Sequence, residues 1–294
     1  MRDKKNTAVV FGLTHEYAFA VACVIMDIKK YSPNWAYEVV ILHDGISIND
    51  QKLLNAILPC RFIKYDFPIK DNSKFNQRIL NYFSKMVFSK FECLKLLDDY
   101  KNVVWLDYDI VIKKDISELT NYCDSGIKMM YLGNKVKDQL LEPVDDYNMK
   151  LEGISAGTFV FQDHIGPYDK MYKFCYNKTE KYAQFLKYPE QAIFDFMIQE
   201  FEINIELIDK DIYCVHPKDV NKYPDAKIIH SYGHEKFWNE VKDEQWYANY
   251  KNWLKMGGGG YNLNKYFINK KLKTILRNLG IYEAIKNFLL KIKN

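Results

Sequence analysis

The sequence lacks any long apolar run. No stretch approaches the roughly 18 uncharged apolar residues that a membrane-spanning helix needs, so we expect no helix to cross a membrane. The first apolar run, residues 8–13, follows a polar start and is too short for the apolar region of a secretory signal. The sequence therefore predicts a cytoplasmic protein.

Paired cysteines and internal repeats are also missing. The six cysteines are scattered along the chain with no Cys-x-x-Cys spacing, which argues against a zinc site. In the cytoplasm we expect them to be reduced. Five of the six lie in apolar surroundings that are typical of a protein core.

An excess of positive charge is missing from most of the chain. The net charge is +4, but segment 261–294 has eight basic residues and one acidic residue, which gives it +7 and leaves −3 for the rest. This distribution argues against nucleic-acid binding and assigns any anionic partner to the C-terminal segment. Four consecutive glycines, 257–260, predict a flexible joint before it. We therefore expect a domain at 1–256 and a basic tail at 257–294.

What the chain does contain is an alternation of apolar strands and helices. Strands are predicted over 7–14, 37–45, 60–67, 102–112, 128–133, 156–163, 205–215 and 226–233. Helices are predicted over 17–31, 49–58 with Asn49 as its cap, 84–97, 189–201 and within 237–256. This order is typical of an α/β fold with a Rossmann-like, mostly parallel sheet flanked by helices. Ligands of such sheets lie at the carboxyl ends of the strands, where Thr14, Asp44 and Asp107 are expected.

Two aspartates interrupt the apolar segment "VVWLDYDIVI". Burying an unpaired carboxylate costs several kcal/mol, so Asp107 and Asp109 require an explanation. Residues i and i+2 of a strand project to the same side, about 6 to 7 Å apart. Two carboxylates placed in this way suit a hard divalent cation such as Mg²⁺ or Mn²⁺.

Two other interpretations of the pair stay open at this point. One aspartate could be a turn residue at the strand end and the other a surface group. The same motif also opens haloacid-dehalogenase-like phosphohydrolases, in which Asp107 would be the nucleophile. In those enzymes the motif usually lies near the N-terminus, unlike its position here.

Several segments, in the same order, resemble glycosyltransferase family eight. This family comprises retaining GT-A glycosyltransferases, including glycogenin and bacterial lipopolysaccharide galactosyl- and glucosyltransferases. The resemblance rests on "AVVFGLTHEYAFAVACVIMDI", "FSKFECLKLL", "VVWLDYDIVIKKDISEL", "GISAGTFVFQ", "YPEQAIFDF" and "IIHSYGHEKFWN". Together they cover residues from about 8 to 240.

The resemblance implies a metal site and a donor site. The metal ligands would be Asp107, Asp109 and His230, holding Mn²⁺ or Mg²⁺ beside a UDP-sugar. The implied donor-binding residues are Leu13, Thr14, Tyr17, Lys90, Asp107, Tyr108, Ser155, Ala156, Gly157, Gly233 and Lys236. From the residues alone, His230 could equally be a strand-end histidine, Tyr17 a core residue, and both lysines solvated.

The resemblance also implies the catalytic residues Gln191, Glu190 and Lys236. Lys236 would neutralise the leaving diphosphate. Gln191 matches the family's glutamine, whose amide is a poor nucleophile, and this favours same-face attack by the acceptor over a double displacement. Glu190 replaces the usual aspartate and Ser155 the usual asparagine, which puts the donor sugar in doubt.

The implied activity is transfer of a hexose, glucose or galactose, from a UDP-sugar to a saccharide or lipid-linked acceptor. The implied process is synthesis of a bacterial surface polysaccharide, either capsule or lipopolysaccharide. The competitor from another class is a non-catalytic sugar-nucleotide-binding protein. In the tail, one predicted helical face and the nearby lysines favour association with the anionic inner face of the cell membrane, with packing on its own domain as the alternative. That face comprises Ile281, Ile285, Phe288, Leu289 and Ile292.

Overall fold

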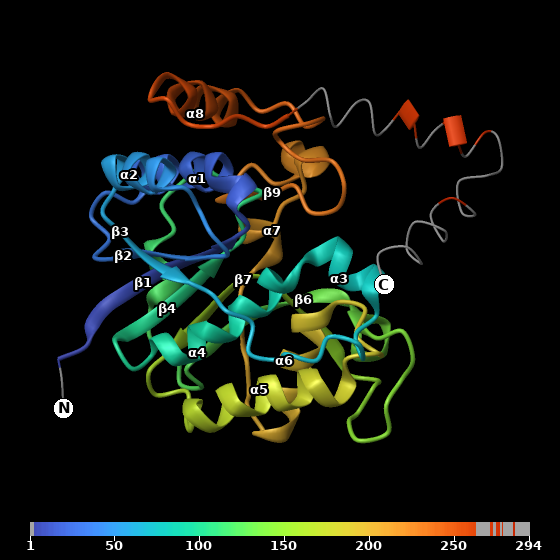
Figure 1. The fold of residues 1–294 in the computed structure, drawn as a ribbon. Helices are drawn as coiled ribbons and strands as arrows, with labels where there is room; N and C mark the ends of the chain where they lie inside the picture. Colours follow the sequence, from blue (N-terminus) through green and yellow to red (C-terminus); the bar gives the residue numbers. More distant parts are fainter. Residues whose placement is uncertain (1–2, 263–270, 273–274, 277, 279–284, 286–294) are drawn as a thin grey trace.

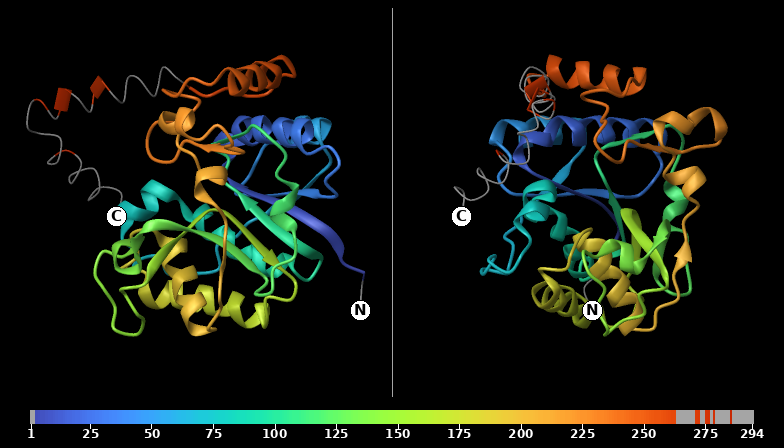
Figure 2. Two further views of the ribbon diagram at one scale, coloured as in Figure 1. Left: turned by 180° about the vertical axis from the view of Figure 1, so that it is seen from behind. Right: turned by 90° about the vertical axis from the view of Figure 1, so that its right-hand side faces the viewer.

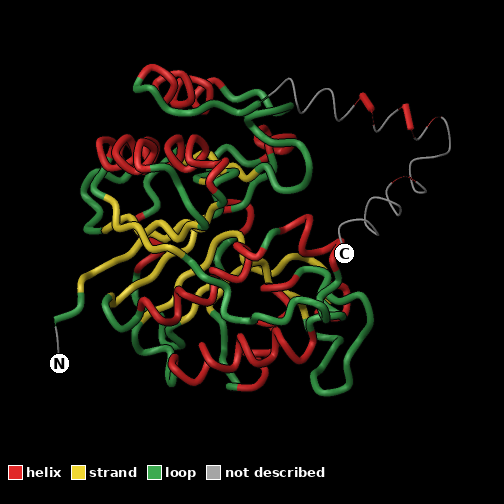
Figure 3. The backbone as a smooth tube through the Cα atoms, viewed as in Figure 1, coloured by secondary structure: helices red, strands yellow, loops and turns green. Residues whose placement is uncertain are grey.

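The computed structural model describes residues 3–262 and, beyond them, residues 271, 272, 275, 276, 278 and 285. Its main feature is a seven-stranded sheet, drawn in yellow in Figure 3. The strands are β1 (Lys5–Leu13), β2 (Glu38–His43), β3 (Cys60–Lys64), β4 (Tyr100–Leu106), β6 (Ile127–Lys135), β7 (Glu152–Gln162) and β8 (Glu206–Leu207). Their order is β3-β2-β1-β4-β7-β6-β8, with β1 to β4 parallel and β7 antiparallel to β4 and β6. The predicted α/β fold with a mostly parallel sheet is confirmed.

Helices cover both faces of this sheet (Figures 1 and 2). One face carries α1 (Ala18–Tyr31) and α2 (Ile48–Ile57), and the other carries α4 (Glu92–Leu96), α5 (Tyr168–Tyr182) and α6 (Pro189–Glu200). A further helix, α8 (Glu244–Lys255), packs on the outer side of α1. Because α1 is enclosed between the sheet and α8, most of its side chains are apolar and buried. Short helices connect the rest: α3 (Gln77–Phe83), α7 (Lys210–Tyr213) and 3₁₀ helices His15–Tyr17, Lys85–Phe91, Ser117–Thr120, Val136–Gln139 and Pro217–Lys222.

A second, two-stranded sheet corrects the prediction of one strand over 102–112. β4 ends at Leu106, and the N–H of Asp107 donates to the carbonyl of Gly157 in β7 (2.9 Å). The chain then leaves the large sheet, and β5 (Ile110–Ile112) pairs antiparallel with β9 (Ile228–His230). The aspartate pair therefore lies at the passage between two sheets, not within one strand.

Three smaller predictions were also wrong. Helix α2 is capped by Ser47, whose hydroxyl accepts the N–H of Asp50, and not by Asn49. The segment predicted as one strand, 205–215, contains only the short β8. Asp209, in the middle of this segment, caps the N-terminus of α7 and so ends the strand. Segment 84–97 folds as a 3₁₀ helix followed by α4, not as one continuous helix.

The glycine segment after α8 is packed against that helix. Trp253 Nε1 donates to the carbonyl of Gly259 (2.9 Å), and Gly258 lies so close to the Trp253 ring that a Cβ would meet it at 2.0 Å. The domain boundary at 257 stays a prediction. The predicted amphipathic helix of the tail lies outside the described residues apart from Ile285. Across the described part of the chain, no helix has the length and apolar character needed to cross a membrane.

Candidate active site

The carboxyl ends of the central strands meet the small sheet at one place. Thr14, Asp44 and Asp107 directly follow β1, β2 and β4, as predicted. Asp109 immediately precedes β5, and the register of the small sheet pairs Ile110 with His230 of β9. This pairing brings His230 to the aspartates although 121 residues separate it from Asp109.

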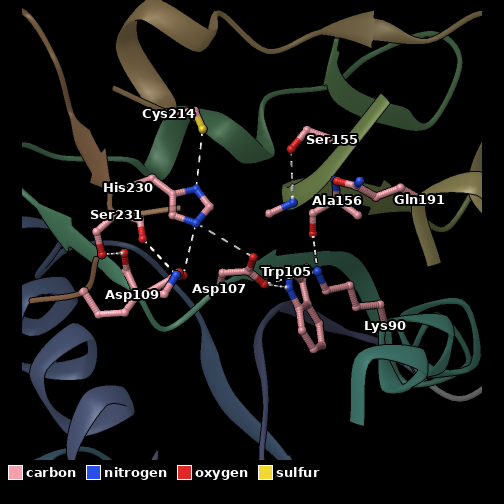
Figure 4. Close-up of polar contacts among 12 residues, drawn as sticks. Lys90, Trp105, Asp107, Asp109, Ser155, Ala156, Gln191, Cys214, His230 and Ser231 are labelled. Atoms are coloured by element: carbon pink, nitrogen blue, oxygen red, sulfur yellow. Dashed lines mark hydrogen bonds and ion pairs between the residues drawn. The ribbon is translucent and has the colours of Figure 1, made fainter. Parts of the chain in front are cut away.

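Asp107, Asp109 and His230 form one cluster (Figure 4). His230 Nε2 lies 3.1 Å from Asp109 Oδ1 and 3.9 Å from Asp107 Oδ2. One ligand atom from each residue lies within 4.8 Å of the other two. Two carboxylate oxygens and an imidazole nitrogen are a donor set that suits Mn²⁺ or Mg²⁺. The residues thus fit a divalent cation.

Positive side chains surround Asp109. Lys236 Nζ contacts Asp109 Oδ2 and donates to the carbonyl of Ser231 (2.8 Å). Burial alone would raise the pKa of the Asp109 carboxyl, but His230 and Lys236 hold it well below its usual range. Burial would likewise lower the pKa of His230, but the Asp109 carboxylate raises it well above its usual value. Asp109 therefore stays charged although its side chain is only 13% exposed.

Lys90 lies beneath the cluster and is nearly inaccessible, with 6% of the residue exposed. Its Nζ lies 2.9 Å from the carbonyl oxygen of Ala156, 3.0 Å from Glu190 Oε1 and 3.2 Å from Asp107 Oδ1. An ammonium group has three protons, and these three acceptors can take all of them. Burial would lower the pKa of Lys90, but Asp107 and Glu190 raise it above its usual value. Lys90 therefore joins the aspartate and histidine cluster to α6.

The "SAG" segment of β7 is packed between the cluster and α6. The N–H of Ala156 donates to Gln191 Oε1 (3.1 Å), and the N–H of Gly157 points to Ser155 Oγ (3.5 Å). A Cβ added to Gly157 would lie 2.7 Å from Cε1 of His230. Only glycine leaves the imidazole its place here, so Gly157 acts through packing.

The remaining predicted donor residues line the end of β1 and the loop after β9. Tyr17 stacks on Tyr108, with ring centroids 5.3 Å apart, and both rings lie beside Trp238. The side chain of Leu13 is buried in the core, so only its backbone could meet a ligand. Gly233 has φ +94°, a conformation that favours glycine, and no atom lies within 4 Å of its Cβ position.

Two residues that contact the cluster were absent from the sequence predictions. Trp105 donates its Nε1 proton to Asp107 Oδ1 (2.8 Å). Its position in β4, two residues before Asp107, was a usable signal. Cys214 Sγ lies 3.4 Å from His230 Nδ1. No spacing pattern in the sequence predicts the contact of Cys214 with His230, because that contact forms only when distant segments pair.

Comparisons with solved structures identify proteins of similar fold. The chain is similar to LgtC, a galactosyltransferase in complex with donor and acceptor sugar analogs (14% identity, TM-score 0.67, 85% of this chain and 99% of that chain). It is also similar to WbbM, a bifunctional glycosyltransferase (16%, 0.65, 87% and 52%), and to GlyE of Streptococcus pneumoniae (13%, 0.57, 91% and 64%). At such identities these structures show the fold alone, which is the GT-A fold. No curated protein matches the sequence.

The sequence itself matches a family model. The model describes glycosyl transferase family 8 and matches residues 8–242, most of the chain. This range includes both sheets, apart from the first three residues of β1, and every residue of the cluster. The phosphohydrolase and the non-catalytic binding protein are therefore set aside. The chain belongs to glycosyl transferase family 8 and is a glycosyltransferase.

Proposed function

We propose that the protein is a metal-dependent, retaining hexosyltransferase that moves glucose or galactose from a UDP-sugar to a saccharide or lipid-linked acceptor. The observation that carries this proposal is the Asp107, Asp109 and His230 cluster at the carboxyl ends of the central strands. Ligands of α/β sheets bind at this edge. Mn²⁺ is the preferred ion because imidazole and carboxylate together suit it, and Mg²⁺ is the second choice.

The donor would lie across the end of β1 and the loop after β9. Thr14, the Leu13 backbone and the Tyr17–Tyr108 pair would meet the uridine. Gly233 would let the backbone approach the diphosphate. Aromatic rings and a glycine turn are suited to a flat base next to a phosphate chain.

Charge around the cluster would assist departure of UDP. A bound divalent cation would withdraw negative charge from the diphosphate. Lys236, whose Nζ contacts Asp109, would neutralise an oxygen of the same diphosphate. Lys90 would act differently, because its protons are already directed to Ala156, Asp107 and Glu190. It would hold the acidic groups in place and not contact the donor.

The positions of Glu190 and Gln191 favour same-face attack by the acceptor. A double displacement needs a carboxylate that is free to attack the sugar. Glu190 is 5% exposed and is paired with Lys90, and the oxygen of Gln191 accepts the N–H of Ala156. Both groups would hold sugar hydroxyls or the strand beside them. The UDP phosphate would then take the proton of the acceptor.

The acceptor and location are inferred from the tail. Its basic and aromatic residues would bind an anionic surface at the inner face of the cell membrane, where lipid-linked saccharides of capsule or lipopolysaccharide synthesis are assembled. Co-sedimentation with anionic liposomes should be lost when the chain is ended at Gly257. Equal sedimentation of both forms would refute the membrane location.

A thermal-shift panel tests the central proposal. UDP, UDP-glucose and UDP-galactose should raise the melting temperature with Mn²⁺ present and much less without it, because ligand binding stabilises the folded state. Other nucleoside diphosphates serve as controls. A protein that ignores UDP at every Mn²⁺ concentration would refute the proposed donor.

A further inference from the structure

The two ring nitrogens of His230 face different neighbours. Nε2 points to the aspartates, 3.1 Å from Asp109 Oδ1, as Figure 4 shows. Nδ1 points the opposite way, 3.4 Å from Cys214 Sγ. A neutral imidazole carries its proton on one nitrogen and a lone pair on the other. An imidazole that binds a cation through Nε2 must therefore carry its proton on Nδ1, where the thiol sulfur lies.

We propose that Cys214 is a positioning residue for the metal site. Its sulfur accepts the Nδ1 proton of His230 and thereby keeps the Nε2 lone pair directed at Asp107 and Asp109. Metal-binding histidines usually direct their second nitrogen to a carboxylate, a carbonyl or water. Here a thiol has that place. The inference rests on the proposed metal-dependent function and names a residue that acts on it.

The backbone around Cys214 holds the sulfur in this position. Cys214 directly follows α7, and its N–H donates to the carbonyl of Lys210 (2.9 Å), the first residue of that helix. The next residue, Val215, accepts the N–H of His230 (2.8 Å). Backbone hydrogen bonds thus hold the chain at Cys214 and at Val215. The second of these bonds comes from His230, whose ring the Cys214 sulfur contacts. This arrangement fixes the backbone from which the thiol projects toward His230.

Other contacts restrict the ring but do not choose between its nitrogens. Gly157 lies against one side, where a Cβ would be 2.7 Å from Cε1. The Tyr232 ring meets the imidazole edge to face, with centroids 5.6 Å apart. Such apolar contacts fix the plane of the ring, but they do not determine whether the proton of the neutral imidazole lies on Nδ1 or on Nε2. Among the described residues, the polar contact at Nδ1 is the Cys214 sulfur.

The test compares Mn²⁺ binding by the wild type and four variants in the presence of UDP. Cys214→Ala and Cys214→Val both remove the acceptor, and valine fills the space of the sulfur with apolar atoms. Cys214→Ser retains an acceptor. Cys60→Ala is the matched control, since Cys60 is the other partly buried cysteine and lies on β3 at the far edge of the sheet. Free Mn²⁺ is measured by electron paramagnetic resonance, and pulsed measurements detect the ¹⁴N coupling of a bound imidazole.

Loss of an outer partner of a metal ligand weakens metal affinity by about 10- to 100-fold, and a weak sulfur acceptor should give about 10-fold. We expect this loss in Cys214→Ala and Cys214→Val, with weaker ¹⁴N coupling and unchanged metal-free melting temperature. Cys214→Ser should bind more tightly than either, and Cys60→Ala as the wild type. Wild-type affinity and coupling in whichever acceptor-free variant folds would overturn the role of Cys214 alone. A wild-type protein that binds no Mn²⁺ would overturn the proposed function and this inference together.

Discussion

The two ends of strand β5 each meet a buried carboxylate, and the structure stabilises the two carboxylates in opposite ways. At one end, Asp109 is surrounded by cationic side chains and its pKa is lowered. At the other end, Oδ2 of Asp27 in α1 accepts the N–H of Ile112 (3.1 Å). Asp27 is only 2% exposed, yet no cation contacts it among the described residues.

Neutral amides hold Asp27 instead. Its Oδ1 accepts protons from Gln245 (2.6 Å) and Asn249 (2.7 Å), which ties α8 to α1 and β5. Burial raises the pKa of Asp27 to about 6, because these bonds and the more distant Lys113 offset only part of the lost hydration. The charge of Asp109 is thus matched with opposite charge, whereas Asp27, which ties α8 to α1 and β5, can take up a proton.

The strongest test of this contrast removes the charge of Asp109, at the end of β5 that belongs to the candidate active site (the site end). Asp109→Asn takes away a proposed metal ligand and removes the carboxylate that lies between His230 and Lys236. We expect hydrolysis and transfer of UDP-glucose or UDP-galactose to fall on the order of 10³-fold. Release of UDP measures the effect.

Asp163→Asn is the control for that variant. Asp163 follows β7, which runs antiparallel to β4, so it lies at the end of the sheet away from the candidate site. It pairs with the partly exposed Lys4. We expect its activity to stay within about twofold of the wild type. An Asp109→Asn enzyme with comparable activity would contradict the metal assignment.

Removing the Lys90 ammonium group should leave carboxylates at the site end without a cationic partner, as Asp27 is at the other end. Lys90→Met leaves Asp107 and Glu190 without their shared ammonium group. Breaking a buried ion pair costs about 3 to 5 kcal/mol, and we expect a loss near 3 kcal/mol because Asp107 is partly exposed. Urea unfolding at pH 7 measures the free energy.

Lys128→Met provides the matched comparison. Lys128 is about as buried as Lys90, but its partner Glu206 is 49% exposed and can be hydrated again. We expect a loss below about 1 kcal/mol. Equal losses in the two variants would show that Lys90 stabilises by packing and not by joining two buried acids.

The site end should also depend on shape. Gly157→Ala places a Cβ 2.7 Å from His230 Cε1 and 3.3 Å from Asp107 Oδ2. Displacing a catalytic group by about 1 Å can cost about 100-fold in rate, and we expect a loss of that size with the fold retained. Gly259→Ala, whose Cβ would have no atom within 4 Å, should keep full activity. Full activity in Gly157→Ala would mean that the ring can move without consequence.

Local patterns were enough to predict the parallel strands in the first half of the fold. Parallel strands that are buried on both faces appear as continuous apolar runs, so β1, β2, β3 and β4 could be recognised. Three strand ends were correctly placed at one edge, and the cluster of Asp107, Asp109 and His230 followed from the family resemblance. Segment 205–215 was misassigned because its apolar residues fit a strand while the cap at Asp209 starts a helix.

The rest depended on contacts between distant segments. Residues 103–112 have the same apolar character before and after the aspartates, so nothing local indicated that β5 leaves the large sheet. The polarity of Lys90 suggested a surface or ligand contact, but the fold buries it between two acids. The Cys214 contact arises only when α7 and β9 come together.

The smallest predicted effect concerns pH at the Asp27 end. An ordinary aspartate has a pKa of 3.8, whereas Asp27 in the folded protein has one of about 6. The folded state therefore holds the proton more tightly than the unfolded state. Its contribution to stability is fully present below pH 4 and is lost as the pH rises through 6. The loss should be about 2 kcal/mol between pH 4 and pH 7.

Asp27→Asn isolates this contribution, because asparagine cannot titrate. Its amide neighbours keep second acceptors, since Gln245 also donates to the carbonyl of Ile112 and Asn249 to that of Cys23. Urea unfolding of both proteins at several pH values gives the difference in free energy. The wild type should lose about 2 kcal/mol relative to the variant from pH 4 to pH 7. A constant difference would mean that Asp27 stays charged throughout, and then neutral amides would stabilise a buried carboxylate as well as the cations around Asp109 do.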